Sequence, residues 1–416
     1  MERRRLSITA QSFILYSCLG LFALRDCIRV IGGKFVIGLN GWEFERYTGP
    51  IMSIFAIISI ILLIIYILAF VRTRLAARLR WVVFFLTLLS IFWTIHSFLT
   101  VPGYSLGTLD GTAKTIWICL LGLYLGYDES SWLRVKKIVP FLAVLYMGLT
   151  FAYVVYIRFN GMWRQQTKQA PYWMTYSTAI WLLAYLVFCY ENKHKIDNYR
   201  LLSLLIMNTF IIAFTISRGW MLQTVFMMVL FITSSSSSRK AKRRLIFLLI
   251  AILGIGTYVL RDEISLYFAS YVSKFLTASS RESQYLSFFS QVPISDLILG
   301  KGEYASYTYR NVQNYIYIDN SYLYYAFHFG ILYALLILGM EIKEGLSILK
   351  VSMNNQDRKI GYILIMWIAA LSGASVFCAG YEVSFRVLFA MILVGRAASV
   401  TDLQRAIPNV EEGLVK

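Results

Sequence analysis

Charged residues are scarce in this chain. Asp, Glu, Lys and Arg make up 15% of its 416 residues, whereas a soluble globular domain is nearer a quarter charged. The hydrophobic share is 58% and the mean hydropathy is +0.62. Because charged side chains are too few to cover a water-exposed surface, the composition excludes an ordinary soluble protein.

Histidine and cysteine are also rare, with three and five copies. His96, His194 and His328 lie far apart, and no His, Asp or Glu spacing fits a metal site. We therefore expect no metal and no other cofactor, and a hydrogen-bonded core position for His328. The five cysteines are scattered, four of them in or beside apolar runs, so no disulfide framework is predicted.

Acidic residues are fewer than basic ones, 22 against 40, which gives a net charge of +18. In a soluble protein such an excess would suggest binding to nucleic acid. In a membrane protein, basic residues mark the cytoplasmic loops. We therefore expect no nucleic-acid partner.

Long apolar runs are what the chain has in abundance. They are about 16–22 residues long, the length that crosses a hydrocarbon core of about 30 Å, whereas a β-barrel would show alternating segments of about 10 residues. The pattern predicts an all-α polytopic membrane protein, a single integral membrane domain over residues 1–416. We place about 12 transmembrane helices at 6–24, 50–71, 81–100, 113–127, 138–157, 173–190, 201–216, 219–233, 245–260, 321–340, 360–379 and 383–399.

Basic clusters predict the orientation of these spans. With both termini in the cytoplasm, every inside connection is a compact group of Lys and Arg, as the positive-inside rule requires. The apolar run after Met1–Arg5 lacks a small-residue cleavage site and is interpreted as the first membrane helix. The stretch 201–233 is divided into two short spans, because Gly219 suits a tight turn. This division places Arg218 at the outer surface.

The largest segment outside the predicted spans is 261–320, which the orientation places on the external side. It is rich in Tyr, Phe and Ser. Apolar residues at 264–276 and 283–289 have partly helical spacing, which predicts short amphipathic helices on the outer face. Loops of this length are usually functional.

Outward-facing basic residues are candidates for binding an anionic substrate. A guanidinium offers a planar fork of donors that suits a diphosphate, although such residues also extend toward lipid headgroups or pair with loop carboxylates. Arg218 interrupts an apolar stretch, where a charge is usually functional. Lys301 lies between two glycines that could admit an anion, but a plain turn explains them better. The candidates are Arg158, Arg164, Arg218, Arg281, Lys301 and Arg310.

Asp319 is the best-placed carboxylate for general base catalysis. It directly precedes the tenth predicted span, where it could accept a proton from a sugar hydroxyl. Asn320 and Tyr322 would then be supporting contacts to the substrate. Asp, Asn and Ser are also the favoured helix N-cap residues, so capping explains Asp319-Asn320-Ser321 equally well. Both interpretations stay open.

In their order along the chain, these motifs resemble those of the bacterial O-antigen polymerase and O-antigen ligase superfamily. The matching elements are Ser217-Arg218-Gly219, Arg281 in a large outer loop, Leu299-Gly300-Lys301-Gly302, Asp319-Asn320-Ser321-Tyr322-Leu323 and Phe329-Gly330. They cover residues 201–340. The first 200 residues match only as a string of hydrophobic spans.

The resemblance implies a GT-C-type fold and a metal-independent inverting glycosyltransferase. It would polymerise undecaprenyl-diphosphate-linked repeat units for O-antigen, capsule or exopolysaccharide at the outer face of the bacterial inner membrane. Arg218 and Arg281 would bind the donor diphosphate, and a group near Asp319 would deprotonate the acceptor. The implied partners are the lipid-linked donor and acceptor and the membrane lipids, with a polysaccharide chain-length regulator as a further candidate.

Two other functions stay open. The similar motif of ligases in this superfamily has His-Asn at the position where this chain has Asp319-Asn320. This difference favours a polymerase over a ligase. A lipid-linked glycan transporter or flippase would need charges within several spans. The sequence places few charges away from the span ends, which disfavours this second alternative.

Overall fold

The computed structural model describes residues 2–35, 41–100, 112–159, 178–189, 195–215, 243, 247, 280–302, 305–315, 318, 320–373 and 385–414. Within these ranges the longer helices are α1 (Glu2–Phe35), α2 (Gly41–Phe70), α3 (Ala77–Thr100), α4 (Thr112–Tyr127), α5 (Glu129–Phe159), α8 (Thr178–Cys189), α9 (Lys195–Thr215), α16 (Ile331–Val351), α17 (Asn355–Gly373) and α18 (Phe385–Leu414). The remaining elements are α13 (Ser280–Gln291), α14 (Ile294–Leu299), β1 (Tyr307–Tyr309), β2 (Val312–Tyr315) and α15 (Ser321–Phe329).

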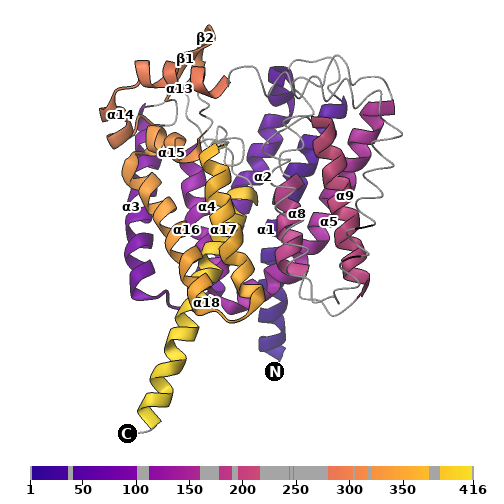
Figure 1. Ribbon diagram of the computed structural model, residues 1–416, viewed down its shortest axis with the longest axis vertical. Coiled ribbons are helices and arrows are strands. Elements are labelled where there is room, and N and C mark those ends of the chain that lie inside the picture. The colour runs from indigo at the N-terminus through magenta and orange to yellow at the C-terminus, as the bar shows by residue number, and fades with distance from the viewer. Residues whose placement is uncertain are drawn as a thin grey trace.

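The long helices form a bundle, and the short elements gather at one end of it. Figure 1 shows both termini at one end of the bundle, and α13, α14 and the β1–β2 hairpin at the opposite end. We call these the terminal end and the hairpin end. The described part of the segment 261–320 therefore lies opposite the termini, and its position on the external side stays a prediction.

Four described helices are long and apolar enough to cross a membrane: Ala10–Ile28, Ala77–Thr100, Glu129–Tyr156 and Phe385–Arg405. Shorter apolar stretches lie at Ile54–Phe70, Trp117–Tyr127 and Tyr199–Ile211. These findings confirm an all-α, membrane-embedded protein. The predicted span 219–233 lies outside the described residues, as does 245–260 apart from residue 247. The number of spans and the GT-C arrangement stay predictions.

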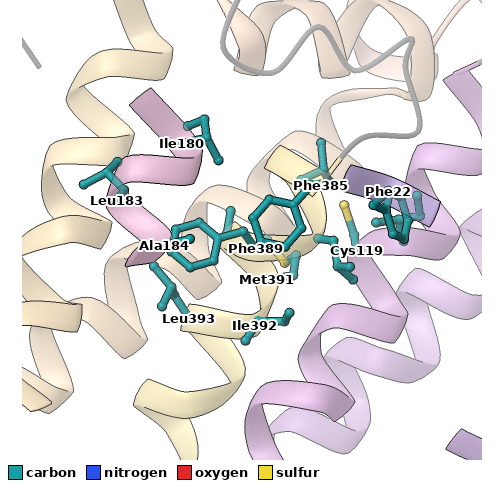
Figure 2. Packing of buried hydrophobic residues seen from close by; sticks show 14 of the residues in the cluster. Phe22, Cys119, Ile180, Leu183, Ala184, Phe385, Phe389, Met391, Ile392 and Leu393 are labelled. Carbon is teal, nitrogen blue, oxygen red and sulfur yellow. The ribbon is translucent and has the colours of Figure 1, made fainter. Parts of the chain in front are cut away.

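α18 is the central helix of the bundle. In its apolar span 78% of the residues are buried, against 22% in that of α3, which exposes large apolar side chains such as Phe84, Ile91 and Phe98. Figure 2 shows side chains of α18 meeting those of α1, α4 and α8 in the core. Phe385 stacks on Trp181 of α8, with ring centroids 3.9 Å apart. α3 therefore belongs to the periphery that faces the bilayer, and α18 to the interior.

Glycines allow α4 and α18 to pack backbone to backbone. A Cβ added at Gly126 would lie 1.9 Å from the carbonyl oxygen of Ile392, and one at Gly122 would lie 2.9 Å from that of Leu388. From the facing helix, a Cβ at Gly395 would lie 2.2 Å from the carbonyl oxygen of Leu123. Small residues of this kind drive helix association in membranes, where the hydrophobic effect between helices is weak.

Ion pairs tie the helices together at the terminal end. Arg78 of α3 donates to both carboxylate oxygens of Glu344 in α16, at 3.3 and 3.0 Å, and lies 2.6 Å from Asp402 of α18. Tyr127 of α4 donates to the same Asp402 at 3.0 Å. A single guanidinium thereby links three helices, and a bidentate geometry makes the contact stronger than a point-charge pair.

Asp128 separates α4 from α5. Its carboxylate accepts hydrogen bonds from the Ser131 amide at 2.8 Å, from the hydroxyls of Ser130 and Ser131 at 2.6 Å, and from Thr73. Burial alone would raise its pKa, but these hydrogen bonds outweigh burial and hold the pKa below its usual value. The carboxylate is therefore an ionised N-cap that fixes the turn between the two helices.

Two features of the hairpin end differ from the sequence-based expectation. The predicted helix at 283–289 is confirmed within α13, while 264–276 lies outside the described residues. The sequence did not predict the antiparallel hairpin in which Tyr307 pairs with Tyr315. The predicted span 321–340 is wrong as one helix, because Gly330, at φ 88°, separates α15 from α16.

We expect Gly126→Ala to destabilise the bundle. Its new Cβ would overlap the α18 backbone, and overpacking of a tight core typically costs about 1–3 kcal/mol. Gly148→Ala in α5 is the matched control, since no heavy atom lies within 4 Å of its Cβ and alanine favours a helix by about 0.5–1 kcal/mol over glycine. Thermal unfolding of both variants in detergent checks this. An equal melting temperature for the two would contradict the close packing of α4 on α18.

Candidate functional site

The candidate site begins where the chain docks onto the end of α15. The backbone amide of Lys301 donates to the carbonyl of Phe327 at 2.8 Å, and that of Gly302 donates to the carbonyl of His328 at 3.0 Å. The carbonyl of Gly302 in turn accepts a hydrogen bond from Nδ1 of His328 at 2.8 Å. His328 is fully buried, so the prediction of a hydrogen-bonded core histidine is confirmed.

Glycine is required on both sides of this contact. Gly300 has φ 85° and Gly330 has φ 88°, in the region that side chains disfavour. A Cβ on Gly300 would lie 2.6 Å from the amide nitrogen of Gly330 and 2.6 Å from the ring of Trp93. The Trp93 indole also donates to the carbonyl of Phe329 at 3.0 Å. The loop, α15 and α3 thus meet at one backbone crossing.

The turn at Gly330 folds α15 back along α16. The hydroxyl of Tyr322 in α15 donates to Oε2 of Glu341 in α16 at 2.6 Å. In one continuous helix, residues 19 positions apart would be separated by about 28 Å along the axis. Glu341 is only 1% exposed, so a carboxylate lies inside the membrane bundle beneath α15. An ionisable residue in that environment is a functional candidate by default.

Asn320 caps α15 and so fixes the position of Tyr322. Its side-chain oxygen accepts a hydrogen bond from the amide of Leu323 at 3.0 Å. The capping interpretation of the motif is therefore confirmed for Asn320. Asp319 lies outside the described residues, and its role as a base stays a prediction.

A second buried polar group joins α1, α8 and α18. Arg25 and Asp26 of α1 and Arg386 of α18 are each 2–3% exposed. The Trp181 indole donates to Oδ2 of Asp26 at 2.9 Å, and the same indole stacks on Phe385, the residue before Arg386. Two guanidiniums therefore lie inside the membrane bundle, where low dielectric strengthens any contact with an anion.

The structure places the predicted basic residues at several points. Lys301 is half exposed and lies 3.4 Å from Asp296. Arg310 is exposed at the tip of the β1–β2 hairpin, with its guanidinium 5.2 Å from the ring centroid of Tyr309. Arg281 is the second residue of α13, and Arg158 belongs to the last turn of α5. Arg164 and Arg218 lie outside the described residues.

Sequence reasoning missed Glu341, Arg25 and Arg386. Arg25 and Glu341 lie just beyond the end of a predicted span, where a charge looks solvated, and Arg386 lies close to the start of the span 383–399. The helices run past the first two ends: α1 continues to Phe35 and α16 to Val351. The available signal for Arg25 and Glu341 was the lack of a Gly or Pro directly after the charge, which would have extended both helices. The buried charges Arg25, Asp26, Glu341 and Arg386 all lie within a few residues of the end of a predicted span.

No protein-family model matches this chain, no curated protein matches its sequence, and no solved structure matches its fold. The resemblance noted in the sequence therefore rests on its motifs alone. The chemistry must be argued from the geometry of this chain.

We expect Gly300→Ala to loosen the docked loop. A left-handed backbone costs a non-glycine residue about 1–2 kcal/mol, and the new Cβ would overlap Gly330 and Trp93. Gly339→Ala in α16, with no heavy atom within 4 Å of its Cβ, is the control. Limited proteolysis of the native protein should cut the loop faster in Gly300→Ala only. Equal cleavage rates would argue against the backbone crossing.

Removing the Tyr322 hydroxyl should destabilise the protein more than altering Glu341. Tyr322→Phe leaves the buried carboxylate without this donor, which typically costs about 1–3 kcal/mol. Glu341→Gln keeps an oxygen that can accept the tyrosine hydrogen bond. Melting temperatures of both variants check this. A Tyr322→Phe variant as stable as the unaltered protein would contradict the contact.

Proposed function

We propose that this protein polymerises undecaprenyl-diphosphate-linked oligosaccharide repeat units, as a metal-independent inverting glycosyltransferase at the outer face of the bacterial inner membrane. The observation that carries the proposal is the course of the chain from α13 to α16. It crosses the hairpin end of a membrane bundle, docks through Gly300–Gly302, and then re-enters the bundle above a buried carboxylate.

This arrangement suits a substrate that is half lipid and half sugar. The polyprenyl chain would stay in the bilayer beside the exposed apolar faces of the peripheral helices. The glycan would lie under α13 and the hairpin. The diphosphate would then lie at the level of the bundle end, where fixed positive charge is needed.

In the proposed reaction, the acceptor sugar hydroxyl attacks C1 of the donor sugar from the face opposite the diphosphate. The new C1–O bond forms as the bond from C1 to the diphosphate oxygen breaks, and the electron pair leaves with the lipid diphosphate. Arg218 and Arg281 stabilise that charge, and the buried Arg25 and Arg386 are further candidates. The hydroxyl proton passes to a carboxylate. Lipid diphosphate as leaving group supplies the driving force.

Two carboxylates compete for the role of base. Asp319 directly precedes the cap of α15. Glu341 accepts a hydrogen bond from Tyr322, which lies three residues after Asp319 in the chain. Glu341 is buried, with 1% of its surface exposed, and burial can tune a carboxylate for proton transfer. Its contact with Tyr322 also suits a positioning role. Glu341→Gln separates these: full polymer length would assign Glu341 to positioning, and loss of all products in a stably folded variant would assign it to proton transfer.

We expect purified protein, given lipid-linked repeat units without nucleotide sugar or metal, to form a ladder of longer products. Arg218→Ala and Arg281→Ala should each lower the yield at least about a hundredfold, since loss of a transition-state contact of this kind costs about 2.7–4 kcal/mol. Arg80→Ala, which removes an exposed arginine at the start of α3, should retain activity. A normal ladder from both site variants would refute the assignment.

The buried charges also favour a second candidate, a transporter of lipid-linked glycans. Arg25, Asp26, Glu341 and Arg386 lie inside the bundle, where transport proteins keep ionisable groups. The two functions differ in their products. Proteoliposomes that move a labelled lipid-linked oligosaccharide across the bilayer without lengthening it would favour the transporter, and a ladder without such movement would favour the polymerase.

A further inference from the structure

A small cavity opens near the terminal end of the bundle, away from the candidate site. It lies where the first turns of α5 and α17 meet α18, beside the end of α8. Its volume is about 170 Å³, and its walls include Trp132, Lys136, Asp357, Lys359 and Arg396. This is too small for a typical drug-sized ligand, whose sites begin at about 300 Å³, but it can hold one compact ionic group.

Positive charge from three different helices converges on this cavity. Lys136 comes from α5, Lys359 from α17 and Arg396 from α18, while Asp357 is the one acidic residue among the lining residues. Glu129 forms an ion pair with Arg396. The three cations thus share the neighbourhood of the cavity with these two acids. Because like charges repel more strongly in a partly desolvated cavity than in water, this arrangement favours an anion between the cations.

Arg396 is held in place with part of its donor set unused. Its guanidinium lies 5.1 Å from the ring centroid of Trp132, and its Nη1 pairs with Glu129. Within the described ranges, its Nε–H is buried and has no hydrogen-bond partner. A guanidinium presents its N–H groups as a fork that fits two oxygens of one anion. A tetrahedral oxyanion in the cavity would lie against this guanidinium, which forms part of the cavity wall.

The environment of Lys359 also favours binding of an anion. Its side chain is at the start of α17, and the residue is only 7% exposed. Burial lowers the pKa of its ammonium to about 8, because desolvation disfavours the charged form. An anion in the cavity would oppose that effect and keep the lysine charged at neutral pH. Lys136 is less buried and lies on the facing helix.

We propose that this cavity binds the phosphate group of an anionic ligand at the membrane surface of the terminal end. A lipid headgroup and a free phosphate compound offer the same chemistry to the two lysines and the arginine. The proposal does not rest on the proposed polymerase reaction, because the residues involved are separate from the candidate site. A negative result for the cavity would therefore not argue against the proposed polymerase reaction.

The test uses the full-length protein in neutral detergent and follows thermal unfolding with two probes. The first is inorganic phosphate against chloride at matched ionic strength. The second is mixed micelles of phosphatidylglycerol against phosphatidylcholine. A ligand that binds the folded state raises the melting temperature in a concentration-dependent way, so each titration gives an apparent Kd. Stabilisation by both probes indicates a general phosphate site, and by phosphatidylglycerol alone a lipid headgroup site.

Lys359→Gln and Lys136→Gln are the test variants, and both keep a side chain of similar length. Each should weaken the apparent Kd for the stabilising probe about tenfold, the effect of losing one charge-assisted hydrogen bond. Lys350→Gln is the control, because Lys350 is exposed in the last turn of α16 and does not line the cavity. Its affinity should equal that of the unaltered protein.

Circular dichroism and gel filtration should show the fold intact in all three variants. Lys359→Gln removes a buried charge and should not be less stable than the unaltered protein without ligand. Two results would overturn the proposal. One is that neither probe stabilises the unaltered protein. The other is that the Lys359 and Lys136 variants bind as well as the Lys350 control.

Discussion

The backbone crossing of Gly300 with Gly330 is the constraint on which the hairpin end depends. Both glycines have positive φ. A Cβ on Gly300 would lie 2.6 Å from the amide nitrogen of Gly330, and a Cβ on Gly330 would lie 2.9 Å from the carbonyl oxygens of Ile298 and Leu299. The amides beside Gly300 donate to the carbonyls at the end of α15, which no longer have partners within that helix. The external segment therefore supplies the C-terminal cap of α15. In return, α15 fixes where that segment lies.

The same crossing determines what can lie beneath it. Because Gly330 ends α15 sharply, α15 packs along α16 and does not extend it. Tyr322 then reaches Glu341, which belongs to the middle of α16. A buried carboxylate needs a donor in this environment, and the tyrosine hydroxyl provides one. The docking of an external loop is thus linked, through one short helix, to an ionisable group inside the bundle.

Much of the architecture could be predicted from the sequence, because long apolar runs have few solutions in a bilayer. The helical bundle and the helix at 283–289 followed from composition and periodicity. The break at Gly330 could not be predicted in this way, since apolar residues continue on both sides of it. The β1–β2 hairpin was equally hidden, because its turn residues Arg310 and Asn311 adopt positive φ without glycine.

The candidate site was predicted less completely than the fold. Asn320 caps α15, as one interpretation of the motif predicted, because local spacing determines capping. The roles of Asn320 and Tyr322 as contacts to the substrate stay predictions. Glu341 and Arg25 were missed because hydropathy locates the end of a span only to within a few residues. An error of that size changes a buried charge into a solvated one. The chemistry of a membrane protein therefore depends on the part of the pattern that hydropathy defines least well.

Charged groups are arranged differently at the terminal end and in the interior of the bundle. At the terminal end, Arg78 is balanced by Glu344 and Asp402, and helices are tied together by complete ion pairs. The nearby cavity has Lys359 and Arg396 among its lining residues. In the bundle interior, Glu341 accepts a hydrogen bond from the neutral hydroxyl of Tyr322. Complete ion pairs stabilise structure, whereas several cations around one cavity favour the binding of an anion.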